Sequence, residues 1–405
     1  MRYIAEISDP IHHYVYLTEV ERDVIDTPVF QRLRRIRQLA GAHLTYPSAH
    51  HTRFEHSLGT MHLAGIAAET LYSKGLIDDD LIELLRLAAL LHDIGHGPFS
   101  HLFEEVIEME EISHEEIGSN IIRIKLDEIL NKHGYSAREI AELSIGNSNK
   151  KFLNDIISGI LSVDAMDYLQ RDSYFTGAEH ARIDAERIIK SYDVYDGDLA
   201  IDKSALYSLE SLMISRYQMF KAVYFHKSVR AAEVMLLHAM IEAKELNIRS
   251  KVRNIDEYLS LTDDSMLNML LNSNKRSSSL AMDYLDRRLL KCVFEHIIQS
   301  RDKLSYESSS LKEEIAREAD LSEDDIYLDI SKAPSLSLTS SKDKPSSLIL
   351  VKKGPERTYE IIGLEDLPLI NSILGYMNMI RVYTPVKYRD IVEEASNKVF
   401  NAIFI

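Results

Sequence analysis

The spacing of apolar and polar residues predicts a mostly helical protein with a small mixed segment near its C-terminal end. Residues 14–18 are rich in Tyr, Val and Thr, which is typical of a strand. Asp26-Thr27-Pro28 predicts a helix start, because proline is favoured at the first helical position. The spacing then stays helical to about residue 300, and the strongly apolar run from Leu81 to Leu91 indicates a buried helix.

The character of the sequence changes after Ile330. Residues 331–346 are rich in Ser, Lys and Pro and predict a linker or exposed loop. Short strands and one helix are predicted beyond it, the strands at 347–352, 359–363 and 379–384 and the helix near 367–374. We therefore expect a mostly α protein, with one helical unit over residues 1–330 and a small α/β element over residues 347–405.

The composition narrows the classes of function. A net charge of −17 disfavours non-specific binding to nucleic acid and to anionic membranes. No apolar run reaches the roughly 20 residues of a membrane helix, and Met1 to Pro10 lacks the apolar stretch of a secretory signal. Cys292 is the only cysteine, which excludes an intramolecular disulfide and fits a reducing compartment. We expect a cytoplasmic protein.

Four arginines between Gln31 and Arg37, with Arg53 soon after, form a basic segment in this acidic chain. Such a segment beside histidines favours a small phosphate-bearing ligand. The alternative is a solvated helix face.

Histidines are concentrated in one part of the chain. Nine of the sixteen lie between His43 and His114, and histidine is both the commonest metal ligand and the residue that titrates nearest neutral pH. The pair His92-Asp93 ends the apolar run and precedes a Gly-rich turn. A buried imidazole and carboxylate are costly unless they are paired or bind a metal, and this donor set suits Fe, Mn, Ni or Zn. The dipeptide alone is a weak signal.

The specificity comes from three strings read together: Arg53–Gly59 (RFEHSLG), Leu91–His101 (LHDIGHGPFSH) and Val163–Asp172 (VDAMDYLQRD). Their order of His, His-Asp and Asp resembles the HD superfamily. The longer strings resemble its deoxynucleoside triphosphate triphosphohydrolases, which include animal enzymes that join a SAM domain to an HD domain. The resemblance runs from Asp9 to about Lys227 and is loose in the C-terminal part. It implies a helical bundle core of the HD-domain type.

The resemblance implies a divalent transition metal held by His56, His92, Asp93 and Asp164, with Mg²⁺ on the substrate's phosphates. Two imidazoles and two carboxylates leave coordination positions for water and a phosphate oxygen, and the metal lowers the pKa of that water. The two carboxylates offset the charge of the ion.

The resemblance also implies an acid–base group of His96, Glu104 and His114. In the family, the residue matched by His114 is oriented by a carboxylate and protonates the leaving 5′ oxygen. The family pattern has Asp where this chain has Glu104, which puts the geometry in question. Taken alone, Glu104 would be interpreted as a solvated helix residue, which is the alternative.

The resemblance implies seven substrate-binding residues: Gln38, Arg53, His101, Tyr168, Asp172, Arg216 and Tyr224. Arg53 and Arg216 match phosphate-binding arginines, whose planar fork suits phosphate oxygens. Gln38 and Asp172 match residues that hydrogen-bond the 3′ hydroxyl. Tyr168 matches a tyrosine under the sugar that leaves no space for a 2′ hydroxyl, which favours a deoxynucleotide.

Two of these positions have alternative interpretations, and one further position departs from the family pattern. Asp172 is otherwise a structural partner of an arginine such as Arg171, and Tyr224 is otherwise a core aromatic residue. Ala165 stands where relatives commonly have a basic residue, and one lost charge-assisted hydrogen bond weakens triphosphate binding by about 1–3 kcal/mol. Another cation can compensate, or the substrate range shifts toward fewer phosphates.

Asp26, Gln31 and Arg34 resemble an allosteric site for a guanine nucleotide activator at a subunit interface in some relatives. A folding role for the same residues is the alternative. By analogy with the family, we expect a homo-oligomer, either a dimer or a tetramer.

The expected activity is hydrolysis of deoxynucleoside triphosphates to deoxynucleoside and triphosphate. Another HD phosphohydrolase activity, such as that of a 5′-nucleotidase or phosphodiesterase, is the nearest alternative. A nucleotide-binding regulator with little catalysis is the alternative from a different class.

Overall fold

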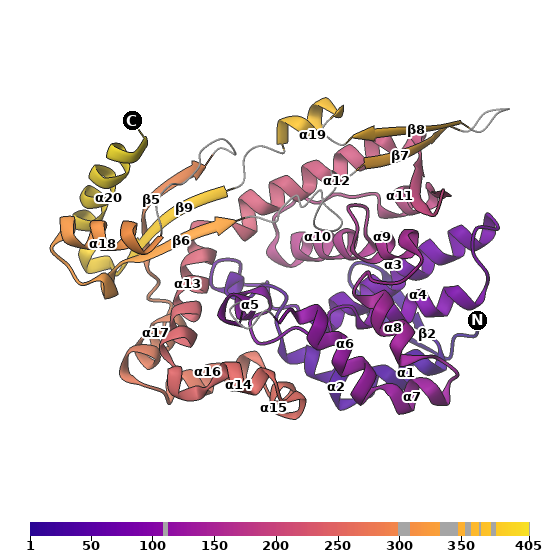
Figure 1. Cartoon of the computed structure of the whole chain (residues 1–405), viewed down its shortest axis with the longest axis horizontal. Helices are drawn as coiled ribbons and strands as arrows, with labels where there is room; N and C mark the ends of the chain where they lie inside the picture. The colour runs from indigo at the N-terminus through magenta and orange to yellow at the C-terminus, as the bar shows by residue number, and fades with distance from the viewer. Residues whose placement is uncertain are drawn as a thin grey trace.

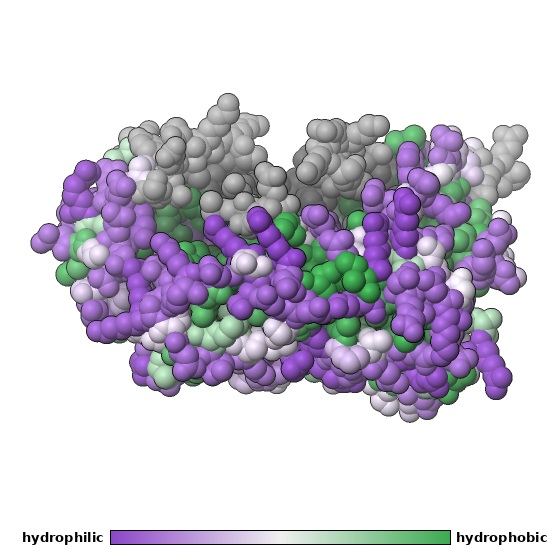
Figure 2. Space-filling view, turned by 60° about the horizontal axis from the view of Figure 1, so that its bottom comes forward, coloured by the Kyte–Doolittle hydropathy of each residue, from purple (hydrophilic) through white to green (hydrophobic). Residues whose placement is uncertain are grey.

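The structure is a computed structural model, and it describes residues 1–107, 112–298, 308–332, 347–352, 358–363, 366–373 and 378–404. A large helical body carries the N-terminus, and a smaller α/β part carries the C-terminus at the opposite end (Figure 1). Polar residues cover most of the face in Figure 2, with apolar side chains gathered between them. Among these residues, no helix combines the length and apolar character needed to cross a membrane.

Three helices form the centre of the body: α3 (Arg53–Ser73), α4 (Asp80–Leu91) and α10 (Val163–Thr176). The sequence predicts the burial of α4 correctly, because Leu81 to Leu91 is buried at every apolar position. A capping box of Thr52 and Glu55 starts α3 and places Arg53 and His56 in its first turn. The hydroxyl of Ser162 caps α10 by accepting a hydrogen bond from the backbone N–H of Ala165, which places Asp164 in the first turn of that helix.

Some of the remaining helices of the body lie around this centre, and α13 to α17, over residues 227–285, extend from it on the side of the C-terminal part (Figure 1). The remaining helices are α1 (Glu19–Ile25), α2 (Pro28–Gln31), α5 (His101–Ile107), α6 (His114–Lys125), α7 (Asp127–Lys132), α8 (Ala137–Ser144), α9 (Lys151–Ser158), α11 (Ala185–Lys190), α12 (Leu206–Met219), α13 (Lys227–Glu242), α14 (Ile248–Val252), α15 (Ile255–Leu259), α16 (Asp263–Leu271) and α17 (Lys275–Leu285). A π-helical turn, Phe220–Tyr224, follows α12.

The strands form three small sheets. An N-terminal hairpin pairs β1 (Ala5–Asp9) with β2 (His13–Leu17). A four-stranded sheet has the order β3 (Tyr192–Tyr195), β4 (Asp198–Asp202), β7 (Ser347–Lys352), β8 (Thr358–Gly363), with β4 and β7 parallel. A three-stranded antiparallel sheet has the order β5 (Lys291–Ile298), β9 (Asn378–Thr384), β6 (Tyr327–Lys332).

The three-stranded sheet has a core of its own. It packs with α18 (Ser308–Ala319) and α20 (Arg389–Phe404) around a separate apolar cluster, in which Leu311, Val382 and Phe400 are fully or almost fully buried. β5 also contacts α13, which joins this part to the body.

The predicted fold class is confirmed, and so are the predicted strands β2, β7, β8 and β9, the helices α2 and α4, and α19 (Pro368–Ile373). The expectation that the chain stays helical to about residue 300 is wrong at β3 and β4, which pair with each other as a hairpin, and at β5, which pairs with the distant strand β9. The strands expected in one C-terminal element join two sheets, and each sheet includes strands from before residue 331. β6 ends at Lys332, and residues 333–346 of the predicted linker lie outside the described residues. The division into domains therefore stays a prediction.

Candidate active site

Three helices bring the four predicted metal ligands together. His56 lies in α3, His92 and Asp93 follow α4, and Asp164 lies in α10. The Nε2 atom of His56 is 3.0 Å from Oδ1 of Asp164 and 3.4 Å from Oδ2 of Asp93. The Nε2 atom of His92 is 3.3 Å from Oδ1 of Asp93 and 3.6 Å from Oδ1 of Asp164.

Both imidazoles present the same nitrogen to this cluster. The Nδ1 atom of His56 is 2.8 Å from Oδ2 of Asp167, and that of His92 is 2.7 Å from the carbonyl oxygen of Ala89. These contacts fix the tautomer in which Nδ1 carries the proton and Nε2 has its lone pair free. Both Nε2 atoms are buried and have no hydrogen-bond partner within the described part of the chain. Buried polar atoms rarely stay unpartnered, so this donor set fits a divalent metal.

Asp167 is a positioning residue that sequence reasoning missed. Its carboxylate contacts His56 and His12, and it also receives two hydrogen bonds from the guanidinium of Arg171, which is paired with Asp9 as well. The close approach needs the glycine at position 59, because a Cβ there would lie 1.9 Å from Oδ1 of Asp167. Burial acts to raise the pKa of Asp167, but Arg171 and the two histidines hold it well below its usual value.

The carboxylates also affect the titration of His56. Burial acts to lower the pKa of His56, but Asp164 and Asp167 raise it to about 10 in the metal-free protein. A proton on this ring therefore competes with a metal ion for the same carboxylate cage.

The predicted acid–base group is also assembled. Oε1 of Glu104 lies 2.9 Å from Nδ1 of His114 and 3.3 Å from Nδ1 of His96. Ser113 caps α6, which places His114 at its first position. Burial acts to lower the pKa of His114, but Glu104 raises it above its usual value. The carboxylate of Glu104 therefore contacts both histidines, although glutamate is longer than the aspartate of the family pattern.

The loop between His96 and His101 is strained, and a residue distant in the sequence stabilises it. Phe99 and Ser100 have φ angles of +61° and +58°, a left-handed conformation that L-residues rarely adopt. The buried carboxylate of Asp263 accepts the backbone N–H of Phe99 and that of Arg37. Nothing in the sequence near His96 indicates this contact with a residue more than 160 positions away.

The predicted sugar-binding residues lie beside the metal-ligand cluster. Asp172 contacts Nε2 of His51 at 2.7 Å and accepts a hydrogen bond from the hydroxyl of Tyr224 at 2.6 Å. The interpretation of Asp172 as a partner of Arg171 is wrong, because Arg171 pairs with Asp167 and Asp9 instead. His51 was not predicted. Its ring stacks on Phe175 with centroids 4.7 Å apart.

Two other predicted residues carry buried polar atoms with no hydrogen-bond partner among the described residues. These are Oε1 of Gln38 and Nε of Arg216. The rings of Tyr168 and Tyr224 meet edge to face, and Tyr168 also contacts the ring of His56. The site therefore places an aromatic wall beside unpartnered polar atoms.

Arg53 and His101 differ in exposure. Arg53 is buried, with Nη1 donating to Asp93 and Nε donating to the hydroxyl of Ser100. His101 has a side chain that is 71% exposed, and its Nδ1 lies 3.2 Å from Oε1 of Glu104.

The predicted allosteric residues lie close together. Arg34 donates to Oε1 of Gln31, Gln31 donates to the carbonyl of Ile25, and Asp26 is exposed at the end of α1. The guanidinium of Arg34 also lies 3.5 Å from the ring centre of Phe54. These contacts are compatible with a folding role, and activator binding stays a prediction.

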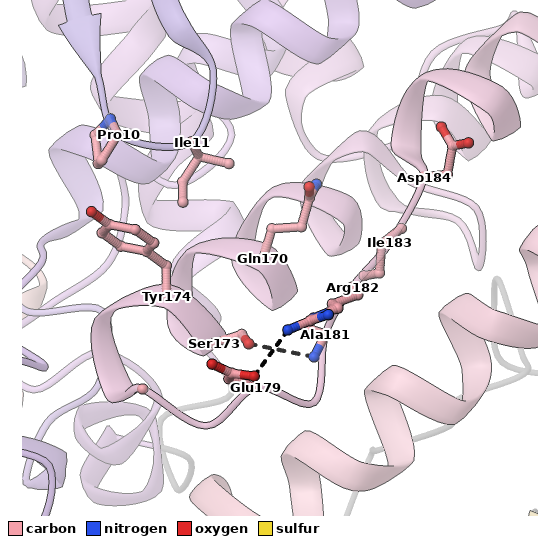
Figure 3. Close-up of a pocket in the computed structure, with 11 residues that line it drawn as sticks. Pro10, Ile11, Gln170, Ser173, Tyr174, Glu179, Ala181, Arg182, Ile183 and Asp184 are labelled. Atoms are coloured by element: carbon pink, nitrogen blue, oxygen red, sulfur yellow. Dashed lines mark hydrogen bonds and ion pairs between the residues drawn. The ribbon is translucent and has the colours of Figure 1, made fainter.

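An open cavity of about 770 Å³ lies between Pro10, Ile11 and the segment from Gly177 to Asp184. Figure 3 shows Gln170, Ser173 and Tyr174 of α10 along its wall. Residues 164, 168 and 172 are spaced by four and share the opposite face of α10. The cavity is therefore separate from the metal-ligand cluster.

Comparison with known proteins agrees with this geometry. The family model of the HD domain matches residues 53–172, and that of the HD associated region matches residues 183–402. The chain therefore belongs to the HD-domain phosphohydrolase family.

Three relatives illustrate the match. An uncharacterized protein of Methanocaldococcus jannaschii is 39% identical over 70% of this chain and 58% of its own length. A deoxynucleoside triphosphate triphosphohydrolase SAMHD1 homolog of Dictyostelium discoideum is 32% identical over 77% of this chain and 64% of its own length. The chain thus spans less than two thirds of the length of each of these two relatives. The crystal structure of a hypothetical protein from Aquifex aeolicus has a TM-score of 0.79 and 30% identity, and covers 96% of this chain and 99% of its own.

Replacement of Asp167 by asparagine should weaken metal binding without removing any of the four proposed ligands. The amide cannot both orient His56 and balance Arg171, so we expect metal affinity to fall by about 10- to 100-fold. Competition with a chelator, followed by metal analysis, measures this affinity. Asp155→Asn, a partly buried aspartate on α9, is the matched control. Unchanged affinity in Asp167→Asn would contradict the positioning role.

Proposed function

We propose that the protein is a metal-dependent hydrolase that cleaves deoxynucleoside triphosphates into deoxynucleoside and triphosphate. The main support is the convergence of two unpartnered imidazole Nε2 atoms with two carboxylates, directly beside the pair formed by His114 and Glu104. His56, His92, Asp93 and Asp164 would hold the metal. A bound divalent metal at such a site polarises a phosphate oxygen and provides a hydroxide near neutral pH.

His114 is the proton donor to the leaving 5′ oxygen in this proposal. Glu104 faces its Nδ1 atom, so the proton to be transferred resides on Nε2. Because Glu104 raises the pKa of His114, it favours the imidazolium form that can donate this proton. Glu104 positions His114 and stabilises its charge, as the aspartate of the family pattern does.

The two arginines have different tasks. Nε of Arg216 is buried and unpartnered among the described residues, which leaves it available for a phosphate oxygen. Arg53 has already committed Nε and Nη1 to Ser100 and Asp93. Arg53 therefore orients a metal ligand, and only the rest of its guanidinium is available for phosphate.

The sugar is read by the wall around Asp172. In the proposal, the carboxylate of Asp172 accepts a hydrogen bond from the 3′ hydroxyl, and the side-chain amide of Gln38 donates a second one to its oxygen. Tyr168 packs under the ring and leaves no space for a 2′ hydroxyl. His51 and Tyr224 hold the Asp172 carboxylate from both oxygens, which keeps it in one orientation. The Dictyostelium relative is named a deoxynucleoside triphosphate triphosphohydrolase, which is consistent with this substrate class.

One observation favours a second candidate. Ala165 is buried and offers no charge where relatives commonly have a basic residue. A nucleotide with fewer phosphates would need less positive charge, so a 5′-nucleotidase or phosphodiesterase activity of the same site is the alternative.

We propose the regulation and assembly of the protein by analogy with the family. Asp26, Gln31 and Arg34 would receive a nucleotide activator between subunits of a dimer or tetramer, and Mg²⁺ would accompany the phosphates of the substrate.

Purified protein supplied with Mn²⁺ and Mg²⁺ should release triphosphate from deoxynucleoside triphosphates and turn over ribonucleoside triphosphates poorly. Triphosphate is expected because the proposed cleavage is at the α-phosphate. Poor turnover of ribonucleotides is expected because Tyr168 leaves no space for a 2′ hydroxyl. Chromatography of products with and without added dGTP or GTP measures both. Release of orthophosphate or pyrophosphate would contradict the proposed bond, and turnover of deoxynucleoside monophosphates alone would favour the second candidate.

The rate should depend on pH through His114. Its pKa in the folded protein is raised and the reaction needs the protonated form, so kcat should fall as pH rises through that pKa. Glu104→Gln should move this fall to lower pH, and His114→Asn should lower kcat by about 10²- to 10⁴-fold. Glu105→Gln, at the exposed next position, is the control. A pH profile in Glu104→Gln identical to that of the original chain would contradict the pairing.

A further inference from the structure

A second group of potential ligands lies next to the first. We call it the His/Glu cluster, and it consists of His96, His101, Glu104 and His114. His96 follows α4, His101 and Glu104 lie in the first turn of α5, and His114 begins α6. One ligand atom from each of the four lies within 4.8 Å of all the others.

Too many imidazole nitrogens face one carboxylate oxygen in this cluster. Oε1 of Glu104 is 2.9, 3.2 and 3.3 Å from the Nδ1 atoms of His114, His101 and His96. A carboxylate oxygen has two lone pairs, so it cannot accept three aligned hydrogen bonds. The Nδ1 atoms of His96 and His114 are in fact buried without an aligned hydrogen-bond partner in the described ranges.

The orientation of His96 is imposed from its other side. Its Nε2 atom lies 3.2 Å from Oδ1 of Asp93, and the ring is 1% exposed. A proton on Nε2 facing that carboxylate leaves the Nδ1 lone pair directed at Glu104. The ring of His96 also stacks on that of His114, with centroids 4.0 Å apart and planes 14° from parallel. The stack brings both Nδ1 atoms to the same side.

We propose that the His/Glu cluster binds a second divalent cation, Zn²⁺, through the three Nδ1 atoms and Oε1 of Glu104. Zinc favours four tetrahedral ligands at about 2.0–2.1 Å, and the edges of such a tetrahedron are about 3.3 Å long. The three distances from Glu104 to the imidazoles already match these edges. The ion therefore needs only small side-chain shifts, and His101 is free to make the largest because its side chain is 71% exposed.

The position of this second site gives it a regulatory consequence, which rests on the proposed function. An ion on Nδ1 of His114 and Oε1 of Glu104 occupies the atoms that hold His114 protonated. Zinc in excess of the first site should then inhibit turnover. The binding itself does not depend on the proposed function.

Cobalt(II) is the probe, because a tetrahedral cobalt ion with nitrogen and oxygen ligands absorbs visible light strongly. The full chain, stripped of metal, is titrated with Co²⁺, and the spectrum and the stoichiometry are recorded. We expect two ions per chain. His92→Ala should lose one ion, His101→Ala should lose the tetrahedral spectrum of the other, and His180→Ala, an exposed histidine outside both groups, should lose neither. Circular dichroism checks that each variant is folded. We expect His101→Ala to fold, because the side chain of His101 is exposed.

The outcomes separate the two proposals. A single ion that His92→Ala removes and His101→Ala leaves in place would overturn the second site, and the cluster would then be a hydrogen-bonded group only. A tetrahedral ion that survives His92→Ala and is lost in His101→Ala supports the site, even if the protein hydrolyses no nucleotide. With both ions bound, failure of added Zn²⁺ to slow turnover would overturn the inhibitory role.

Discussion

The contact between Asp167 and His56 is the interaction on which the rest of the site depends. It fixes which nitrogen of a fully buried ring faces Asp93 and Asp164. The carboxylate that makes it is itself held by His12 and Arg171, and Arg171 reaches back to Asp9 at the end of β1. The N-terminal hairpin, α3 and α10 are thereby joined at one buried set of charges. Removing one member of such a set leaves another buried charge uncompensated, which is strongly destabilising.

A second set of contacts holds the acid–base group near the metal-ligand cluster. The left-handed turn at Phe99 and Ser100 is strained, and Asp263 and Arg53 stabilise it through the backbone of Phe99 and the hydroxyl of Ser100. Arg53 binds Asp93 with its other nitrogen, so one guanidinium links the turn to a proposed ligand. These contacts hold Glu104 and His114 beside the metal-ligand cluster, although neither residue is one of its four proposed ligands.

The sequence predicts those features that local pattern or motif spacing encodes. The buried helix α4, the helix start at Thr27 and the strands of residues 347–384 all depend on nearby residues. The three strings of the HD pattern likewise predicted the convergence of His56, His92, Asp93 and Asp164. Contacts between distant positions were not predictable in this way. The pairing of β4 with β7 and of β5 with β9, the contact of Asp263 with Phe99, and the place of His51 beside Asp172 all arise from tertiary packing. The pairing of Asp167 with Arg171 could have been predicted from the sequence, because an aspartate and an arginine four residues apart on a helix form a pair.

The most direct test of the central claim is anomalous X-ray diffraction from crystals of the protein grown with Mn²⁺, recorded near the manganese absorption edge. The account predicts an anomalous peak between the Nε2 atoms of His56 and His92 and the carboxylates of Asp93 and Asp164, at about 2.0–2.2 Å from its ligands. Crystals in which those four side chains keep their positions around no metal, while manganese binds elsewhere, would contradict it.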